Sequence, residues 1–344
     1  MLAGAGCGGN ARDTGPTQSR YVSGDLPAGV MGQLVEGTLA RQAGDDDIAL
    51  RLLESAIREE EALILPNKVV GEIYRERGDL SRAEVFFTRL LRRDPDTPLN
   101  HFLLAEVYEL SGRIEAAIGA YLSGLELEPD SFAGNFGLGR SYVAADRPGE
   151  AIAPLRKATE TDPQSGDAWL SLGLAYQAAD NAESAEEAYL RAEERIDRRT
   201  PKFATLLIAM AVNRSRQDRP QEAIPLLREA AEIDGTAETK RMLADAHAAA
   251  GESARRAGDR RTADVQLQLA VDTYDDLLES GEQDTALLNA KAAALLRLWQ
   301  IGGQLDSGLR DRAIEAWQAS LDLDPDQPRV EDAIRRFGEA GILD

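Results

Sequence analysis

The chain has 344 residues, of which 43% are hydrophobic and 29% charged, and its formal net charge is −21. Phosphate backbones are bound by clustered Lys and Arg, so this acidic excess argues against nucleic acid as a partner and leaves cationic partners open. The single cysteine, Cys7, excludes an internal disulfide framework and a thiolate zinc site. No stretch of about 18 uninterrupted apolar residues occurs, so no transmembrane helix is expected.

Residues 1–28 are expected to form a signal-peptide remnant or a flexible tether. Cys7 follows a run of small residues and precedes a polar tract that reaches about Ser23. The segment resembles the end of a bacterial lipoprotein signal peptide, although Gly4 stands where that family has an aliphatic residue and the basic and apolar regions are missing. We therefore expect Met1 to be an internal start and Cys7 to carry lipid, giving peripheral membrane contact at the periplasmic side of a bacterial cell envelope. The alternative is an incidental thiol in a cytoplasmic protein.

The next feature along the chain is an internal repeat of 34 residues. It is carried by Tyr74, Tyr108, Tyr142 and Tyr176, by Ala83, Ala117, Ala151 and Ala185, and by Pro95, Pro129 and Pro163. A fixed period of this length is the sequence signature of stacked repeats. The units are expected at 30–63, 64–97, 98–131, 132–165, 166–199 and 204–237, within an array that spans 29–237.

Each unit is predicted to form two helices joined by a tight turn. In the unit 64–97 apolar residues recur at a spacing of three to four, and the first helix is expected to stop at Gly78-Asp79. Asp94-Pro95 and Asp162-Pro163 should end second helices, because the residue before proline is disfavoured in the α region.

Beyond residue 237 the strict period is lost, but helical hairpins are still expected. Two elongated hairpins are predicted within 238–327, and His247 falls at position 11 of its helix. A last helix, from Pro328 to about Phe337 within 328–344, is predicted to cap the array, since the terminal face of a repeat stack needs a polar cover.

The pattern resembles the tetratricopeptide repeat, which has a small residue at position 8, Tyr at 11, Ala at 20, an aromatic residue at 24, Ala at 27 and Pro at 32. The unit 98–131 carries it as Leu104, Ala105, Tyr108, Gly112, Ala117, Tyr121, Gly124 and Pro129. The resemblance implies an all-α fold, a right-handed superhelical α-solenoid of antiparallel helix pairs. The repeat tyrosines and Trp169 are expected to be packing residues, and small residues should lie where helix backbones approach closely.

No constellation of catalytic or metal-binding residues is found in the sequence. His101 and His247, the two histidines, have no HExxH motif, cysteine partner or serine motif near them. There is no GxxxxGK[ST] loop, and the glycines around Gly137 lie in a predicted helix and do not follow a strand. We expect no enzyme activity, no cofactor and no metal site. An accessory subunit of an enzyme complex is an alternative function.

In this family, first-helix positions 2, 5, 9, 12 and 13 line the concave surface, so the resemblance implies a protein or peptide ligand there. The predicted groove residues are Leu99, Phe102, Glu106, Phe136, Arg140, Leu170, Leu174, Ile208 and Val212. They do not match the Lys/Asn/Lys/Arg clamp of chaperone-binding members, so an acidic C-terminal peptide is not expected. An apolar stripe that faces solvent is typical of an interaction surface, unless other parts of the array cover it. The predicted function is a noncatalytic protein-interaction scaffold.

Overall fold

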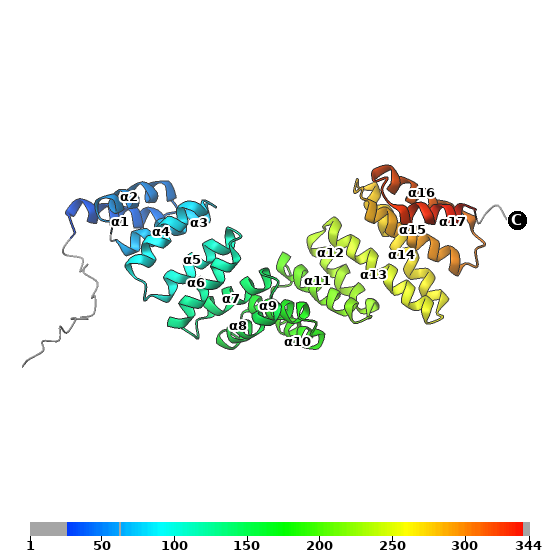
Figure 1. Ribbon diagram of the computed structural model, residues 1–344, viewed down its shortest axis with the longest axis horizontal. Coiled ribbons are helices and arrows are strands. Elements are labelled where there is room, and N and C mark those ends of the chain that lie inside the picture. The colour runs from blue at the N-terminus through cyan, green and yellow to red at the C-terminus, as the bar shows by residue number, and fades with distance from the viewer. Residues whose placement is uncertain (1–25, 62, 340–344) are drawn as a thin grey trace, which may run out of the picture. The chain divides into compact units, whose positions relative to one another are not determined.

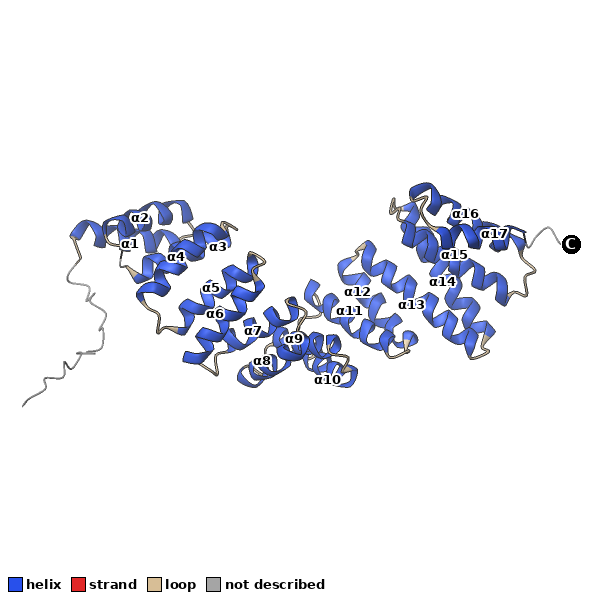
Figure 2. Cartoon of the chain, in the orientation of Figure 1, coloured by secondary structure: helices blue, strands red, loops and turns tan. Residues whose placement is uncertain are grey.

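The computed structural model describes residues 26–61 and 63–339, which form seventeen α-helices and no strand (Figure 2). Successive helices lie side by side in antiparallel pairs joined by short turns (Figure 1). The chain divides into two compact units, Met1–Leu127 and Glu128–Asp344. No helix in the described part of the chain is long and apolar enough to span a membrane. The expected all-α fold, an α-solenoid of helix pairs, is confirmed.

The described part of the first unit contains three helix pairs. These are α1 (Ala28–Gln42) with α2 (Asp46–Glu59), α3 (Ile64–Glu76) with α4 (Leu80–Arg93), and α5 (Pro98–Leu110) with α6 (Ile114–Leu127). Buried side chains of α2 to α5, among them Leu53, Ile73, Phe87 and Val107, pack into one core. Each pair therefore covers an apolar face of the next.

The second unit continues with five pairs and a final helix. These are α7 (Phe132–Ala144) with α8 (Pro148–Thr161), α9 (Gly166–Ala178) with α10 (Ala182–Glu193), α11 (Pro201–Arg216) with α12 (Pro220–Asp234), α13 (Ala237–Arg256) with α14 (Arg260–Glu279), α15 (Thr285–Ile301) with α16 (Ser307–Leu323), and α17 (Pro328–Glu339). The helices of the last two pairs are 17 to 20 residues long, and the final helix packs on α16, where the ring of Phe337 lies 6.1 Å from that of Trp317. The array limits drawn from the sequence at residues 28, 237 and 327 stay predictions.

One turn position within each repeat adopts a left-handed backbone conformation. The position is occupied by Gly44, Gly78 and Gly112 in the first unit, and by Asp146, Asp180 and Asp218, at φ of 57°, 58° and 59°, in the second. Glycine has no Cβ to oppose this conformation, and Asp tolerates it better than most residues. The second helices α4 and α8 end at Arg93 and Thr161, directly before the Asp-Pro dipeptides expected to stop them.

The close approach of the two helices in a repeat depends on a pairing between positions 8 and 24. A methyl group added to Gly139 would lie 2.3 Å from Cγ of Leu155, and one added to Gly173 would lie 2.4 Å from Cε1 of Tyr189. The repeat tyrosines also pack. Tyr74 is buried, and Tyr108 is half-buried with the guanidinium of Arg113 4.4 Å from its ring centroid.

A side-chain N–H at position 4 binds the end of the preceding repeat. Trp169 Nε1 donates to the carbonyl of Pro163 at 3.1 Å, and Asn135 Nδ2 donates to that of Pro129 at 2.8 Å. His101 Nε2 lies 2.8 Å from the carbonyl of Pro95, again six residues earlier. These bonds satisfy carbonyls of the loop that follows each second helix, two residues past the helix end. His101 therefore has a structural role, because it links α5 to the loop that follows α4.

Candidate partner-binding surface

In the first unit, the predicted groove residues divide between core and surface. Leu99 is 42% exposed, but Phe102 is only 3% exposed, with its ring against Gly124 and 6.2 Å from the ring of Tyr121. Glu106 forms an ion pair with Arg75. Phe102 was expected to face solvent. It is instead part of the core between α5 and α6, because glycine at position 27 leaves room for its ring.

The second unit shows the same division. Leu170 is 7% exposed and belongs to a core cluster, whereas Leu174, one turn later on α9, is 37% exposed. Phe136 is half-buried, with exposed Arg140 over its ring at 5.6 Å. Ile208 and Val212 on α11 are half-buried. Binding by the nine residues stays a prediction, and Leu99, Arg140 and Leu174 are its exposed members.

Three adjoining cavities follow one side of α13 in the second unit. Their volumes are about 400, 470 and 390 Å³, and Asp245 lines all three. The first and third share Met242, and the second and third share Ser215 and Ala249. We call this set the α13 groove. It is a continuous recess of a size that accepts side chains of a ligand.

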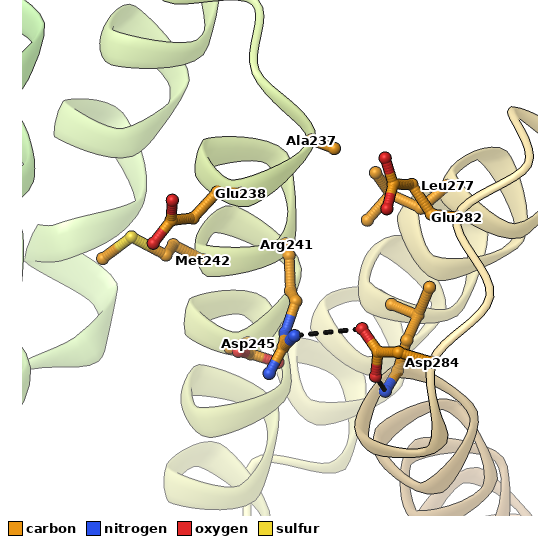
Figure 3. Close-up of a pocket in the computed structure, with 9 residues that line it drawn as sticks. Ala237, Glu238, Arg241, Met242, Asp245, Leu277, Glu282 and Asp284 are labelled. Carbon is orange, nitrogen blue, oxygen red and sulfur yellow. Dashed lines mark hydrogen bonds and ion pairs between the residues drawn. The ribbon is translucent and has the colours of Figure 1, made fainter. Parts of the chain in front are cut away.

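The first cavity lies between α13 and the segment that leads into α15 (Figure 3). Arg241 reaches across it, and its Nη1 lies 3.2 Å from Oδ2 of Asp284. The other oxygen of Asp284 accepts the backbone N–H of Leu287 at 2.7 Å, which caps α15. The cap fixes this carboxylate, and the carboxylate in turn holds Arg241.

The second and third cavities are bordered by α11 and α13, and the second also by α15. Tyr274 of α14 is buried and donates its hydroxyl to Oδ1 of Asp245 at 2.6 Å. Burial raises the pKa of Tyr274, and the nearby Asp245 carboxylate acts in the same direction. Hydrogen bonds from Arg255 and Arg256 lower the pKa of Glu252 to about 2. Glu252 is therefore a carboxylate at neutral pH.

Five residues of this groove were not among the predicted site residues, although their positions in the repeat could be read from the sequence. With His247 at position 11, the concave positions 2, 5, 9, 12 and 13 of this helix fall on Glu238, Arg241, Asp245, Ala248 and Ala249. All of them line one of the three cavities. Because the strict 34-residue period is lost after residue 237, the concave positions of this helix were not assigned from the sequence. Of the predicted set, Val212 lines the third cavity.

The described residues hold no group of three or more His, Cys, Asp or Glu side chains placed to bind a metal ion. His247 is 4% exposed, and its Nδ1 lies 2.7 Å from Oε1 of Gln266. Burial lowers the pKa of His247, which favours the neutral ring. This histidine is a packing residue, as expected. Cys7, the predicted lipid site, lies outside the described residues.

The chain thus belongs to the class of helical repeat proteins, in which the first helices of successive repeats form one surface. The helix pairs, the constant turn position and the recess along α13 all fit this class. A tetratricopeptide repeat family model matches residues 70–132 and 136–201. These residues therefore form tetratricopeptide repeats, and that repeat is generally a noncatalytic protein-interaction module. A search of curated proteins found no match.

Solved structures share the fold. The C-terminal part of a TPR repeat-containing protein from Cytophaga hutchinsonii is 16% identical, with a TM-score of 0.58, and the match covers 77% of this chain and 98% of that one. A tetratricopeptide repeat protein from Parabacteroides merdae is 15% identical, with a TM-score of 0.53 and coverage of 78% and 100%. YrrB, described as a TPR protein with an unusual peptide-binding site, is 18% identical, with a TM-score of 0.46 and coverage of 54% and 94%.

Proposed function

We propose that this protein is a noncatalytic scaffold that binds a peptide or a partner helix on the exposed faces of its first helices. The observation that carries the proposal is the α13 groove, whose walls are the positions through which tetratricopeptide repeats present their concave surface. Exposed Leu174 on α9 and half-buried Val212 on α11 add apolar surface to first helices of the same unit. The third cavity, in which six of the nine lining residues are apolar, combines apolar surface with fixed polar groups, as is typical of ligand sites.

The test compares substitutions on the first helices with matched ones elsewhere. Leu174→Asp combined with Ala249→Trp changes two exposed first-helix positions, while Leu190→Asp places the same charge on exposed α10. Partners are recovered by cross-linking from the native cell. We expect the double variant to lose a partner that wild type and Leu190→Asp retain, with unchanged melting curves. Equal recovery by all three proteins would count against the proposal.

We further propose that lipid on Cys7 holds the scaffold at a bacterial cell envelope. The support is the sequence around Cys7, a run of small residues before the cysteine and a polar tract after it. Labelling with a fatty-acid analogue in the native cell, followed by membrane fractionation, tests this. Wild type should carry the label and sediment with membranes, whereas Cys7→Ser should do neither. An unlabelled, soluble wild-type protein would favour a cytoplasmic adaptor.

A further inference from the structure

The α13 groove has an excess of negative charge that its own arginines do not neutralise. Six carboxylates and four arginines line the three cavities. Every one of these arginines pairs with a carboxylate other than Asp245. Arg241 pairs with Asp284, Arg256 and Arg297 with Glu252, and Arg216 with Asp180 outside the groove. Four carboxylates of the groove are left without an ion pair among the described residues: Asp218, Glu238, Asp245 and Glu282.

Asp245 is the central member of these four, because it borders all three cavities. Its Oδ1 accepts the hydroxyl of Tyr274, and its Oδ2 has no hydrogen-bond donor among the described residues. Tyr274 is almost fully buried, so it fixes the carboxylate from within the helix pair while Asp245 itself stays exposed. A positioned carboxylate with one free oxygen is suited to accept a charge-assisted hydrogen bond from a ligand.

Apolar surface lies directly beside this carboxylate. Six of the nine residues of the third cavity are apolar, and among them Val212, Leu227 and Met242 come from three successive helices. The ligand that complements the site therefore combines a cationic group with an apolar one. In a peptide this combination is an arginine or lysine close to an aliphatic or aromatic residue.

We propose that the α13 groove binds a basic peptide segment, with an arginine or lysine side chain on Asp245 and an adjacent apolar side chain in the third cavity. This inference rests on the proposed scaffold function and specifies its ligand class. Complementary charge favours this ligand and repels acidic segments, and its contribution weakens as salt screens the exposed groups.

The probe is an array of nonapeptides whose central residue is arginine, citrulline or glutamate and whose flanking residues sample leucine, alanine and serine. Citrulline keeps the shape of arginine and removes its charge. The full chain should bind the arginine peptides with about tenfold higher affinity than the citrulline peptides and should not bind the glutamate peptides. A tenfold difference in affinity corresponds to about one well-placed charge pair. The selected peptide is then titrated in solution by fluorescence anisotropy.

Two charge-matched variants complete the test. Asp245→Asn retains an acceptor for Tyr274 and should weaken the arginine peptide by about tenfold while leaving the citrulline peptide unchanged. Asp264→Asn removes the same charge from an exposed position on α14 outside the cavities and should have no effect. Equal binding of arginine and citrulline peptides, unchanged affinity in Asp245→Asn, or no peptide bound at all would overturn the inference. The scaffold proposal would still stand if the first-helix variants abolished partner recovery.

Discussion

The ring of Phe87 occupies the space that a side chain on Gly71 would need. A methyl group on Gly71 would lie 2.6 Å from Cε1 of Phe87, far closer than two carbon atoms can approach. The same relationship joins Gly37 to Leu53 and Gly251 to Leu267. Two helices of a repeat thus come together because one position has no side chain and its partner sixteen residues later has a large one.

Gly139→Ala tests this pairing at the centre of the array. The new methyl group would overlap Leu155, so we expect a loss of about 1–3 kcal/mol in the free energy of unfolding, with a larger loss for Gly139→Leu. Urea unfolding measures the change. Gly149→Ala is the control, because open space surrounds that exposed glycine and alanine favours a helix by about 0.5–1 kcal/mol. Equal effects at the two positions would contradict the packing role.

The position-4 hydrogen bond gives a second prediction. Asn135→Leu removes the N–H that reaches the carbonyl of Pro129, so we expect a loss of about 1–3 kcal/mol in unfolding free energy. Asn135→His should recover part of this stability, because His101 contacts the equivalent carbonyl of Pro95. The comparison of the two variants by chemical unfolding separates the bond from the volume change. If histidine is no better than leucine, the hydrogen bond is not the stabilising element.

His247 should make stability depend on pH. Burial depresses its pKa below the ordinary value of 6.5, so below about pH 6.5 the unfolded chain binds a proton that the folded chain resists. Stability therefore falls as the pH falls from 6.5 toward the folded pKa, and is unaffected by this group at higher pH. We expect His247→Gln to lose less stability than wild type between about pH 7.5 and 5.5. An identical loss in both proteins would show that another group carries the dependence.

Phe102 and Leu99 allow the division of the predicted groove to be tested. Phe102→Ala empties a core position and should cost about 3–5 kcal/mol of unfolding free energy, whereas Leu99→Ala removes an exposed side chain and should change it by less than about 0.5 kcal/mol. Thermal melts of the two variants provide the measurement. If Phe102→Ala lowered the free energy of unfolding only slightly, the assignment of Phe102 to the core would be wrong.

The sequence predicted the fold well because the features that set it are local and periodic. The turn at Gly78 and the stop before Asp94-Pro95 depend on the backbone preferences of single residues, and the period repeats the signal. Which of the predicted groove residues are buried and which are exposed was harder to predict from the sequence. Phe102 is buried because Gly124, twenty-two residues later, leaves room for its ring, and such a contact is decided by packing and not by the position of Phe102 in its repeat.

The α13 groove was missed for a different reason. Asp245 occupies a concave position of its helix, but α13 and α14 are each 20 residues long, so the spacing that revealed the earlier units is stretched there. The availability of Asp245 to a ligand also depends on which carboxylates form ion pairs with the neighbouring arginines. Arg241 binds Asp284, forty-three residues away, and leaves Asp245 open. The 34-residue period of the sequence does not predict this ion pair.

The bond from position 4 to the preceding repeat has a consequence for how such arrays diverge. Asn67, His101, Asn135 and Trp169 have little in common as amino acids, yet each presents a ring or amide nitrogen to the carbonyl six residues earlier. A comparison of these four repeats by residue identity finds three different amino acids at this position. What these four repeats keep is the ability to offer a nitrogen to that carbonyl, and the unit 204–237, which has Leu207 at this position, lacks it.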